Sequence, residues 1–207
     1  MFDALLYSGA IMMGIFSFST LTAMLLCGLK NKPVCKMDNK FEKKLIDFMS
    51  VSSATLVETS ILTAYVIHPR LDSIRMHDFI HTACNITLYI TMVELLYYGY
   101  HYWIHHSPFY KLIHAKHHES IQVYPMDTFY LEFWDMQSIV VSMSVPLFFV
   151  NLNMNEHIVT LYYYMTVGYL SHSDAFYTHH ETHHKYFKCN YCFTLPIVDK
   201  IFGTYRE

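Results

Sequence analysis

Long apolar stretches separated by short polar segments set the pattern of this chain. The first stretch covers residues 2–29, and a third covers 79–100. Between them, residues 47–67 form a weaker apolar stretch that is rich in Ser and Thr and carries Glu58. A helix that crosses a bilayer needs about 20 mainly apolar residues. The pattern therefore predicts three membrane-spanning helices, with Glu58 turned toward the protein interior.

Two shorter apolar stretches follow, at 136–150 and 157–171, and the polar turn 151–156 joins them. We expect them to form a helical hairpin in the membrane, partly buried in protein. The aromatic-rich segment 124–135 is expected at the membrane interface, where Tyr and Trp are common. The fold class predicted is all-α: a polytopic membrane protein of about four to five transmembrane or re-entrant helices with a cytoplasmic histidine-rich cap. We expect one domain over residues 1–207.

Lysines concentrate between the first and second apolar stretches, in residues 30–44. By the positive-inside rule this loop is expected in the cytoplasm, with the N-terminus on the other side. Residues 68–77 then form a short loop on the far face. Counting the spans from there places both histidine-rich segments and the C-terminus on the cytoplasmic side.

Composition agrees with a membrane protein, because 53% of the 207 residues are hydrophobic and only 15% are charged. The net charge of −3, without a basic cluster, gives no indication of nucleic-acid binding. The five cysteines are scattered and suggest no disulfide framework. Cys189 and Cys192 form a lone CxxC without a second pair, so no zinc site is expected there.

Fifteen histidines are present, and most of them lie in two segments, residues 101–118 and 172–184. If these segments are helical, residues three and four apart share a face, so their imidazoles converge. Imidazole is the commonest metal ligand, and so many buried rings are costly unless something binds them. The candidate ligands are His101, His105, His114, His117, His118, His172, His180, His183 and His184.

The other histidines are weaker candidates. Four are expected to be loop or turn residues on the far side of the membrane: His68, His77, His81 and His157. His106 points about 100° away from His105 on a helix, so it is expected behind a ligand or at the surface. The side chain of His179 could point either way. Glu94 could accept a hydrogen bond from a ligand imidazole or be a buried carboxyl satisfied by other neighbours.

One metal ion takes four to six ligands, so nine imidazoles suggest two ions. Neutral imidazoles suit iron, zinc, copper or nickel, and the ligand type alone does not choose among them. A nitrogen-rich metal pair at a membrane surface faces substrates dissolved in lipid. Oxidation of an unactivated C–H bond needs an oxidant that side chains lack, and a reduced metal pair with O₂ can supply it. Metal occupancy is expected to fall below about pH 6.5, where free imidazole becomes protonated.

The segments HYWIHH, IHAKHH and HHETHH, in this order, resemble the HxxxH, HxxHH and HxxHH boxes of the fatty acid hydroxylase/sterol desaturase superfamily. His172-Ser173 is similar to the isolated HS of that superfamily, and Asn190-Tyr191 with residues 199–204 is similar to its C-terminal signature. The resemblance covers roughly residues 90–205 and is nearest to the sterol-acting branch.

This resemblance implies an endoplasmic-reticulum enzyme with two Fe ions that uses O₂ to hydroxylate or desaturate a sterol or fatty acyl lipid. Electrons would come from NAD(P)H through a separate reductase or b-type cytochrome. The chain departs from sterol-acting relatives in three places: only seven residues separate His172 from His180, Cys192 replaces a frequent Gly, and the second hairpin, 136–171, is short. These departures put the identity of the substrate in doubt more than the metal binding.

Two other functions are weighed against this one. A membrane zinc hydrolase would need a carboxylate base beside the metal, as in HExxH. Glu181 is the only carboxylate inside a box, and its order relative to the histidines is wrong. A metal-binding relative without turnover is the other alternative, and the intact boxes argue against it.

Overall fold

The protein is helical throughout the part that the computed structural model describes, residues 2–71 and 74–207. No β-strand forms within these residues, and the only sheet-like feature is an isolated bridge between Ser173 and Phe176. The predicted all-α fold class is confirmed.

Three helical segments within the described residues are long and apolar enough to cross a membrane. They are α1 (Phe2–Leu29), the run of α2 (Phe41–Leu62) through the π turn η1 (Thr63–Ile67) into α3 (His68–Leu71), and α4 (Phe79–His106). Many of their apolar side chains point outward and are exposed, such as Leu25, Ile61 and Leu88. Such surfaces suit lipid rather than water. Together with its family, reported below, they indicate an integral membrane protein.

The second span is longer than predicted, because the helix continues to Leu71. The expected loop 68–77 is therefore wrong over His68–Leu71, and residues 72–73 lie outside the described part of the chain. Pro69 lacks the N–H that would continue the α-helical ladder. The π turn just before it accommodates that break, so the helix changes hydrogen-bond pattern here instead of ending.

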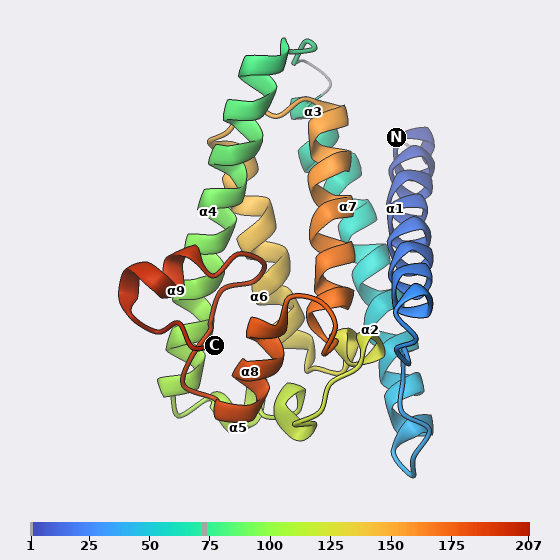
Figure 1. The fold of residues 1–207 in the computed structure, drawn as a ribbon. Coiled ribbons are helices and arrows are strands. Elements are labelled where there is room, and N and C mark those ends of the chain that lie inside the picture. Colours follow the sequence, from blue (N-terminus) through green and yellow to red (C-terminus); the bar gives the residue numbers. More distant parts are fainter. Residues whose placement is uncertain (1, 72–73) are drawn as a thin grey trace.

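The predicted hairpin is present as α6 (Phe133–Ser144), a 3₁₀ turn η4 (Val145–Phe148) and α7 (Met154–Ser171). Pro146 lies where α6 gives way to the 3₁₀ turn. Asn153 begins α7 with a capping box: its side chain accepts from the backbone of Asn155 and Glu156, and Glu156 accepts from the backbone of Asn153. Helix α7 packs along α1 (Figure 1).

The histidine-rich segments lie at one end of the bundle, opposite the N-terminus (Figure 1). They include α5 (Tyr110–Ile113), η2 (His117–Glu119) and α8 (Thr178–Tyr186). Residues 101–118 are only partly helical, since α4 ends at His106. Pro108 disfavours a helical conformation at Ser107, and only short turns follow.

The segment 124–135, which is expected at the membrane interface, is largely buried within the protein. It contains the 3₁₀ helix η3 (Pro125–Phe129), which packs against α2 and α7. Asp127 is 3% exposed because it forms an ion pair with the buried Lys44, with 2.7 Å between Nζ and Oδ1. Phe133 and Trp134 are exposed, so only this part of the segment is available to a membrane interface.

The lysine-rich loop lies at the same end of the bundle as the histidines, as the sequence-derived topology requires. Lys32 pairs with Asp174 just after His172, with 2.7 Å between Nζ and Oδ2. Lys40 approaches Glu119 just after His118, at 3.6 Å. These contacts join segments that are far apart in sequence.

A last short helix, α9 (Ile197–Phe202), packs on the side of α4 (Figure 1). Among the apolar clusters of the described residues, two lie between the long helices. One gathers Ile67, Leu71, Tyr89, Val93, Leu147, Val150, Leu152 and Tyr164 at the end distant from the histidines. The other gathers Ala23, Cys27, Phe129, Leu131, Met136, Tyr169 and Leu170 nearer to them.

Candidate metal centre

The structure gathers all nine candidate histidines into two groups that could each hold a metal ion. The five-histidine cluster contains His101, His105, His114, His118 and His183. The four-histidine cluster contains His117, His172, His180 and His184. Within each cluster the potential ligand atoms lie within 4.8 Å of one another. His105 is partly buried and the other members are buried.

In the five-histidine cluster the Nε2 atoms face one another. The distance between Nε2 atoms is 3.1 Å for His101 and His114 and 3.0 Å for His114 and His118. It is 3.1 Å for His118 and His183. Metal–imidazole bonds are about 2.0–2.1 Å long, so adjacent ligands of one ion have nitrogens about 3 Å apart. The observed spacing suits such a set of ligands.

Hydrogen bonds at the other ring nitrogen show which tautomer these histidines adopt. Nδ1 of His101 donates to the carbonyl of Tyr191 at 2.8 Å, and Nδ1 of His183 donates to that of Cys189 at 2.6 Å. Nδ1 of His114 donates to the carboxylate of Asp135 at 2.7 Å. These acceptors cannot donate, so the neutral rings carry their hydrogen on Nδ1. Their Nε2 lone pairs then face one another, an arrangement that a cation between them stabilises.

The four-histidine cluster is built in the same way, with fewer such hydrogen bonds. Nε2 of His172 lies 3.3 Å from Nε2 of His117 and 3.2 Å from Nε2 of His180. Nδ1 of His172 donates to the carbonyl of Gly168 at 2.8 Å, and Nδ1 of His184 to that of Ser120 at 3.1 Å. In the described part of the chain, Nδ1 of His117 and Nδ1 of His180 have no hydrogen-bond partner.

Burial keeps these imidazoles neutral. Desolvation, followed by the proximity of other histidines, holds the pKa of His117, His180 and His184 well below the usual value of 6.5. The same causes act on His118, and burial lowers the pKa of His183 to about 3. Neutral imidazole is the form that binds metal, so the clusters are ready to bind at neutral pH.

Asp135 belongs to this centre, and the sequence analysis did not identify it. It lies in the first turn of α6, is 3% exposed, and accepts from His114 Nδ1 and from the hydroxyl of Tyr100, each at 2.7 Å. A carboxylate that accepts from a ligand imidazole orients the ring and makes it a better donor to the metal. The signal available in the sequence was an acidic residue inside an aromatic apolar segment.

The loop 189–192 provides the backbone carbonyls that accept hydrogen bonds from His101 and His183. Residues of the C-terminal signature hold this loop in place. The buried carboxylate of Asp199 accepts from the backbone N–H of Tyr191 and of Cys192, both at 2.8 Å. Asn190 adopts a left-handed conformation, with φ of 57°, and its side chain donates to the carbonyl of His179 at 2.9 Å. The loop 189–192 is thereby held against the five-histidine cluster.

The structure also answers the alternatives left open at Glu94, His106 and His179. Glu94 accepts from the backbone N–H groups of Phe193 and Thr194, both at 2.9 Å, and the structure shows no bond from it to a ligand imidazole in the described chain. His106 donates to the carbonyl of Tyr102 and stacks on its ring, outside both clusters. His179 is buried but belongs to neither cluster.

Both cysteines of the CxxC are free, and neither joins a candidate metal group among the described residues.

The far-face histidines are not all loop residues as expected. His77 lies in a connecting segment and bonds to Glu156 at 3.0 Å, whereas the exposed His81 is in the first turn of α4. His68 is buried in α3 and its Nδ1 lies 2.8 Å from the hydroxyl of Ser8. His157 is buried in the first turn of α7. The expectation of loop residues is therefore wrong for His68, His81 and His157, which lie in helices, and only His77 lies in a connecting segment.

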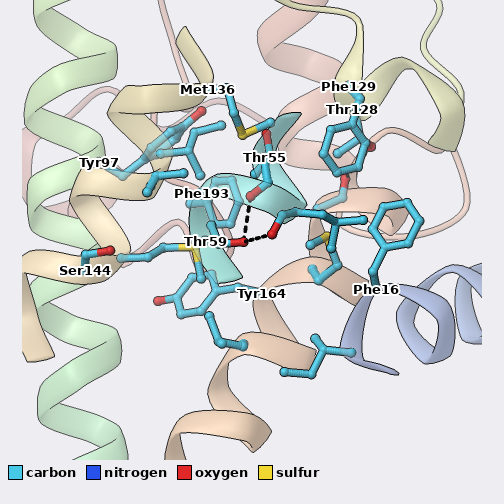
Figure 2. Close-up of a pocket in the computed structure, with 18 of the residues that line it drawn as sticks. Phe16, Thr55, Thr59, Tyr97, Thr128, Phe129, Met136, Ser144, Tyr164 and Phe193 are labelled. Atoms are coloured by element: carbon cyan, nitrogen blue, oxygen red, sulfur yellow. Dashed lines mark hydrogen bonds between the residues drawn. The ribbon is translucent and has the colours of Figure 1, made fainter. Parts of the chain in front are cut away.

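A cavity of about 140 Å³ leads from the histidines into the bundle between α1, α2, α6 and α7. Figure 2 shows Thr55 and Thr59 on one wall with the rings of Phe16, Tyr164 and Phe193 around them. Members of both clusters line one end of the cavity, here called the histidine end. His114 comes from the five-histidine cluster, and His117, His172 and His180 come from the four-histidine cluster. A long apolar molecule in this cavity would reach both.

The chain is similar in sequence to known plant proteins. The chain is 26% identical over 166 residues to the very-long-chain aldehyde decarbonylase CER1 of Arabidopsis thaliana, covering 67% of this chain and 24% of that protein. It is 28% identical over 135 residues to the very-long-chain aldehyde decarbonylase GL1-6 of Oryza sativa, covering 54% of this chain and 21% of that protein. The chain thus matches about a quarter of the length of these relatives.

No solved structure matches the chain. Residues 86–204, more than half of the chain, match the fatty acid hydroxylase family, and this range contains both histidine clusters and the loop that holds them. The chain belongs to the fatty acid hydroxylase family.

Proposed function

We propose that this protein is a membrane-bound di-iron oxygenase that hydroxylates or desaturates a lipid. The nine candidate histidines would bind two Fe ions, one in each cluster. The clusters and the family both suggest a metal cofactor, with iron as the metal. Iron bound there, with O₂ and electrons, would supply the oxidant needed for an unactivated C–H bond.

The cavity carries this proposal, because its histidine end is formed by members of both clusters. Its walls are mainly apolar side chains, with the hydroxyls of Thr55 and Thr59 on one of them, so it suits a sterol or an acyl chain better than water. A C–H bond at the histidine end would then lie against both ions. Asp135 and the carbonyls of Tyr191 and Cys189 would keep the ligand rings oriented while the substrate binds.

Electrons would come from NAD(P)H through a separate reductase or b-type cytochrome. The lysine-rich loop 30–44 lies at the same end as both clusters, and the positive-inside rule would place this end in the cytoplasm. We propose the endoplasmic reticulum as the membrane. A donor protein could then approach the clusters without crossing the bilayer.

Decarbonylation of a long-chain aldehyde is a second candidate reaction. The similar plant proteins are named as very-long-chain aldehyde decarbonylases, and the apolar cavity suits a long alkyl chain. In that reaction the polar aldehyde carbon would lie at the histidine end, and the methyl end would lie deep in the cavity. The two reactions therefore orient their substrates in opposite ways.

Purified protein in lipid nanodiscs, loaded with Fe(II) and supplied with an electron donor and isotopically labelled O₂, tests the proposal. We expect the label in a hydroxylated sterol or acyl chain, or a new double bond with O₂ consumption. A His105→Ala variant should be inactive, whereas a variant of the exposed His81 should keep its activity. Turnover without O₂, or label that comes only from water, would instead support a zinc hydrolase.

A further inference from the structure

His157 lines the cavity at the end distant from both clusters. It is 3% exposed, and within the described chain neither of its ring nitrogens has a hydrogen-bond partner. His157 lies in the first turn of α7 and His172 directly follows the last residue of this helix, so 15 residues at a rise of about 1.5 Å separate their backbones by about 22 Å. His157 is therefore a polar group at the far end of an apolar cavity, too far from the clusters to share their ions.

An unpartnered imidazole in such a place is costly. A neutral ring offers one N–H donor and one acceptor, and a buried polar group without a partner costs about 1–3 kcal/mol. The Thr59 hydroxyl on the cavity wall is different, because it donates to the carbonyls of Thr55 and Leu56 in its own helix, as Figure 2 shows. Thr59 thus turns its hydrogen-bonding capacity back to the backbone, whereas His157 keeps both nitrogens available.

The surroundings of His157 define what could pair with it. Ile67 and Leu147 line the same cavity and belong to the apolar cluster that closes this end. No Lys or Arg lines the cavity in the described chain, so a carboxylate or phosphate there would be a buried and unpaired charge. A neutral oxygen, such as a hydroxyl or a carbonyl, suits the site.

We propose that His157 binds a neutral oxygen-bearing group at the end of the lipid substrate opposite to the carbon that reacts. This rests on the proposed function, which places the reacting carbon at the histidine clusters. The substrate is then an elongated lipid with a hydroxyl or carbonyl oxygen about 22 Å from its reacting C–H bond. A simple aldehyde with a methyl end would leave His157 unpaired, so the geometry favours oxidation over decarbonylation.

Equilibrium binding to metal-free protein in nanodiscs tests this without turnover. The probes are straight hydrocarbon chains that differ only at one end: a primary alcohol, an aldehyde or the plain alkane, each over a series of chain lengths. The proteins are the unchanged protein, His157→Leu, which removes both nitrogens, and His157→Gln, which keeps a donor and an acceptor. His81→Leu, at an exposed histidine, is the matched control.

The unchanged protein and His81→Leu should bind one of the oxygen-ended probes about tenfold more tightly than the methyl-ended one. His157→Leu should lose this preference and His157→Gln should keep part of it. The hydroxyl and carbonyl arms identify which oxygen is bound. No preference in the unchanged protein would mean that His157 binds a buried water only, and a preference that survives in His157→Leu would also overturn the proposal.

Thermal unfolding and size-exclusion profiles of each variant show whether it is folded. If His157→Leu does not fold, the comparison of unchanged protein, His81→Leu and His157→Gln still decides the outcome. Failure of the oxygenase proposal would appear separately, as a normal binding preference without oxidation by the iron-loaded protein.

Discussion

The two histidine clusters use the same chemical group, but their surroundings differ. In the five-histidine cluster, three rings are oriented by acceptors at Nδ1, and one of these acceptors is the carboxylate of Asp135. In the four-histidine cluster, backbone carbonyls and the hydroxyls of Thr128 and Ser171 contact Nδ1 atoms, and no carboxylate does among the described residues. Within the described chain, one Nδ1 of the five-histidine cluster and two of the four-histidine cluster have no hydrogen-bond partner. Three members of the four-histidine cluster line the cavity, against one of the other.

This difference suggests a division of roles within the proposed di-iron centre. An ion in the five-histidine cluster should bind more tightly, because the Asp135 carboxylate makes His114 a better donor to the metal. The four-histidine cluster presents more of its members to the cavity.

The largest effect is expected from loss of a ligand. His101→Ala should abolish activity and remove the ion of the five-histidine cluster, while His172→Ala should abolish activity and remove the other ion. Iron content per protein, measured by elemental analysis, should fall by about half in each variant. Loss of all iron in both variants would contradict two separable sites. His106→Ala is the control, since His106 lies outside both clusters.

Asp135→Asn should weaken metal binding at the five-histidine cluster by about 10–100-fold, because an amide orients and polarises His114 less well than a carboxylate. The four-histidine cluster should bind as before. Metal titration followed by competition with a chelator measures both affinities. Asp174→Asn, at an exposed ion pair with Lys32, is the matched control. Equal weakening of both clusters would show that Asp135 acts on the fold rather than on one site.

The stability of the metal-free protein should fall as the pH drops below about 6.5. Burial lowers the pKa of His117, His180 and His184, so the unfolded chain takes up protons in this range that the folded chain does not. Because the imidazoles of the folded protein stay neutral at lower pH, metal should also remain bound below pH 6.5, the value at which free imidazole becomes protonated. Thermal unfolding with and without metal across this range checks both. Metal-free protein that is equally stable at pH 7 and 5 would contradict the lowered pKa values.

The smallest effect is expected at Lys44, which supports the four-histidine cluster indirectly. Its ammonium donates to Asp127 and to the hydroxyl of Ser120, whose carbonyl accepts from His184. Lys44→Met should weaken metal binding at the four-histidine cluster several-fold and leave the other cluster unchanged. Lys43→Met, at an exposed lysine, serves for comparison. A change at the five-histidine cluster instead would place the effect of Lys44 elsewhere.

The sequence by itself determined the helical class, the approximate positions of the long helices and the nine histidines that the structure gathers. It could do so because apolar length and histidine spacing are local properties. It also placed the lysine-rich loop and the histidines at one end, which follows from counting spans. The effects of Pro69 and Pro108 were harder to predict from the sequence, because whether a helix continues or ends at a proline depends on what packs around it.

Only the tertiary structure divided the histidines between the clusters. The adjacent His117 and His118 belong to different groups, and α8 contributes His183 to one and His180 with His184 to the other. The sequence could not show that Asp135 meets His114, or that His157 lies at the end of a cavity. These relations join residues from different helices, and the packing of those helices sets which side chains meet.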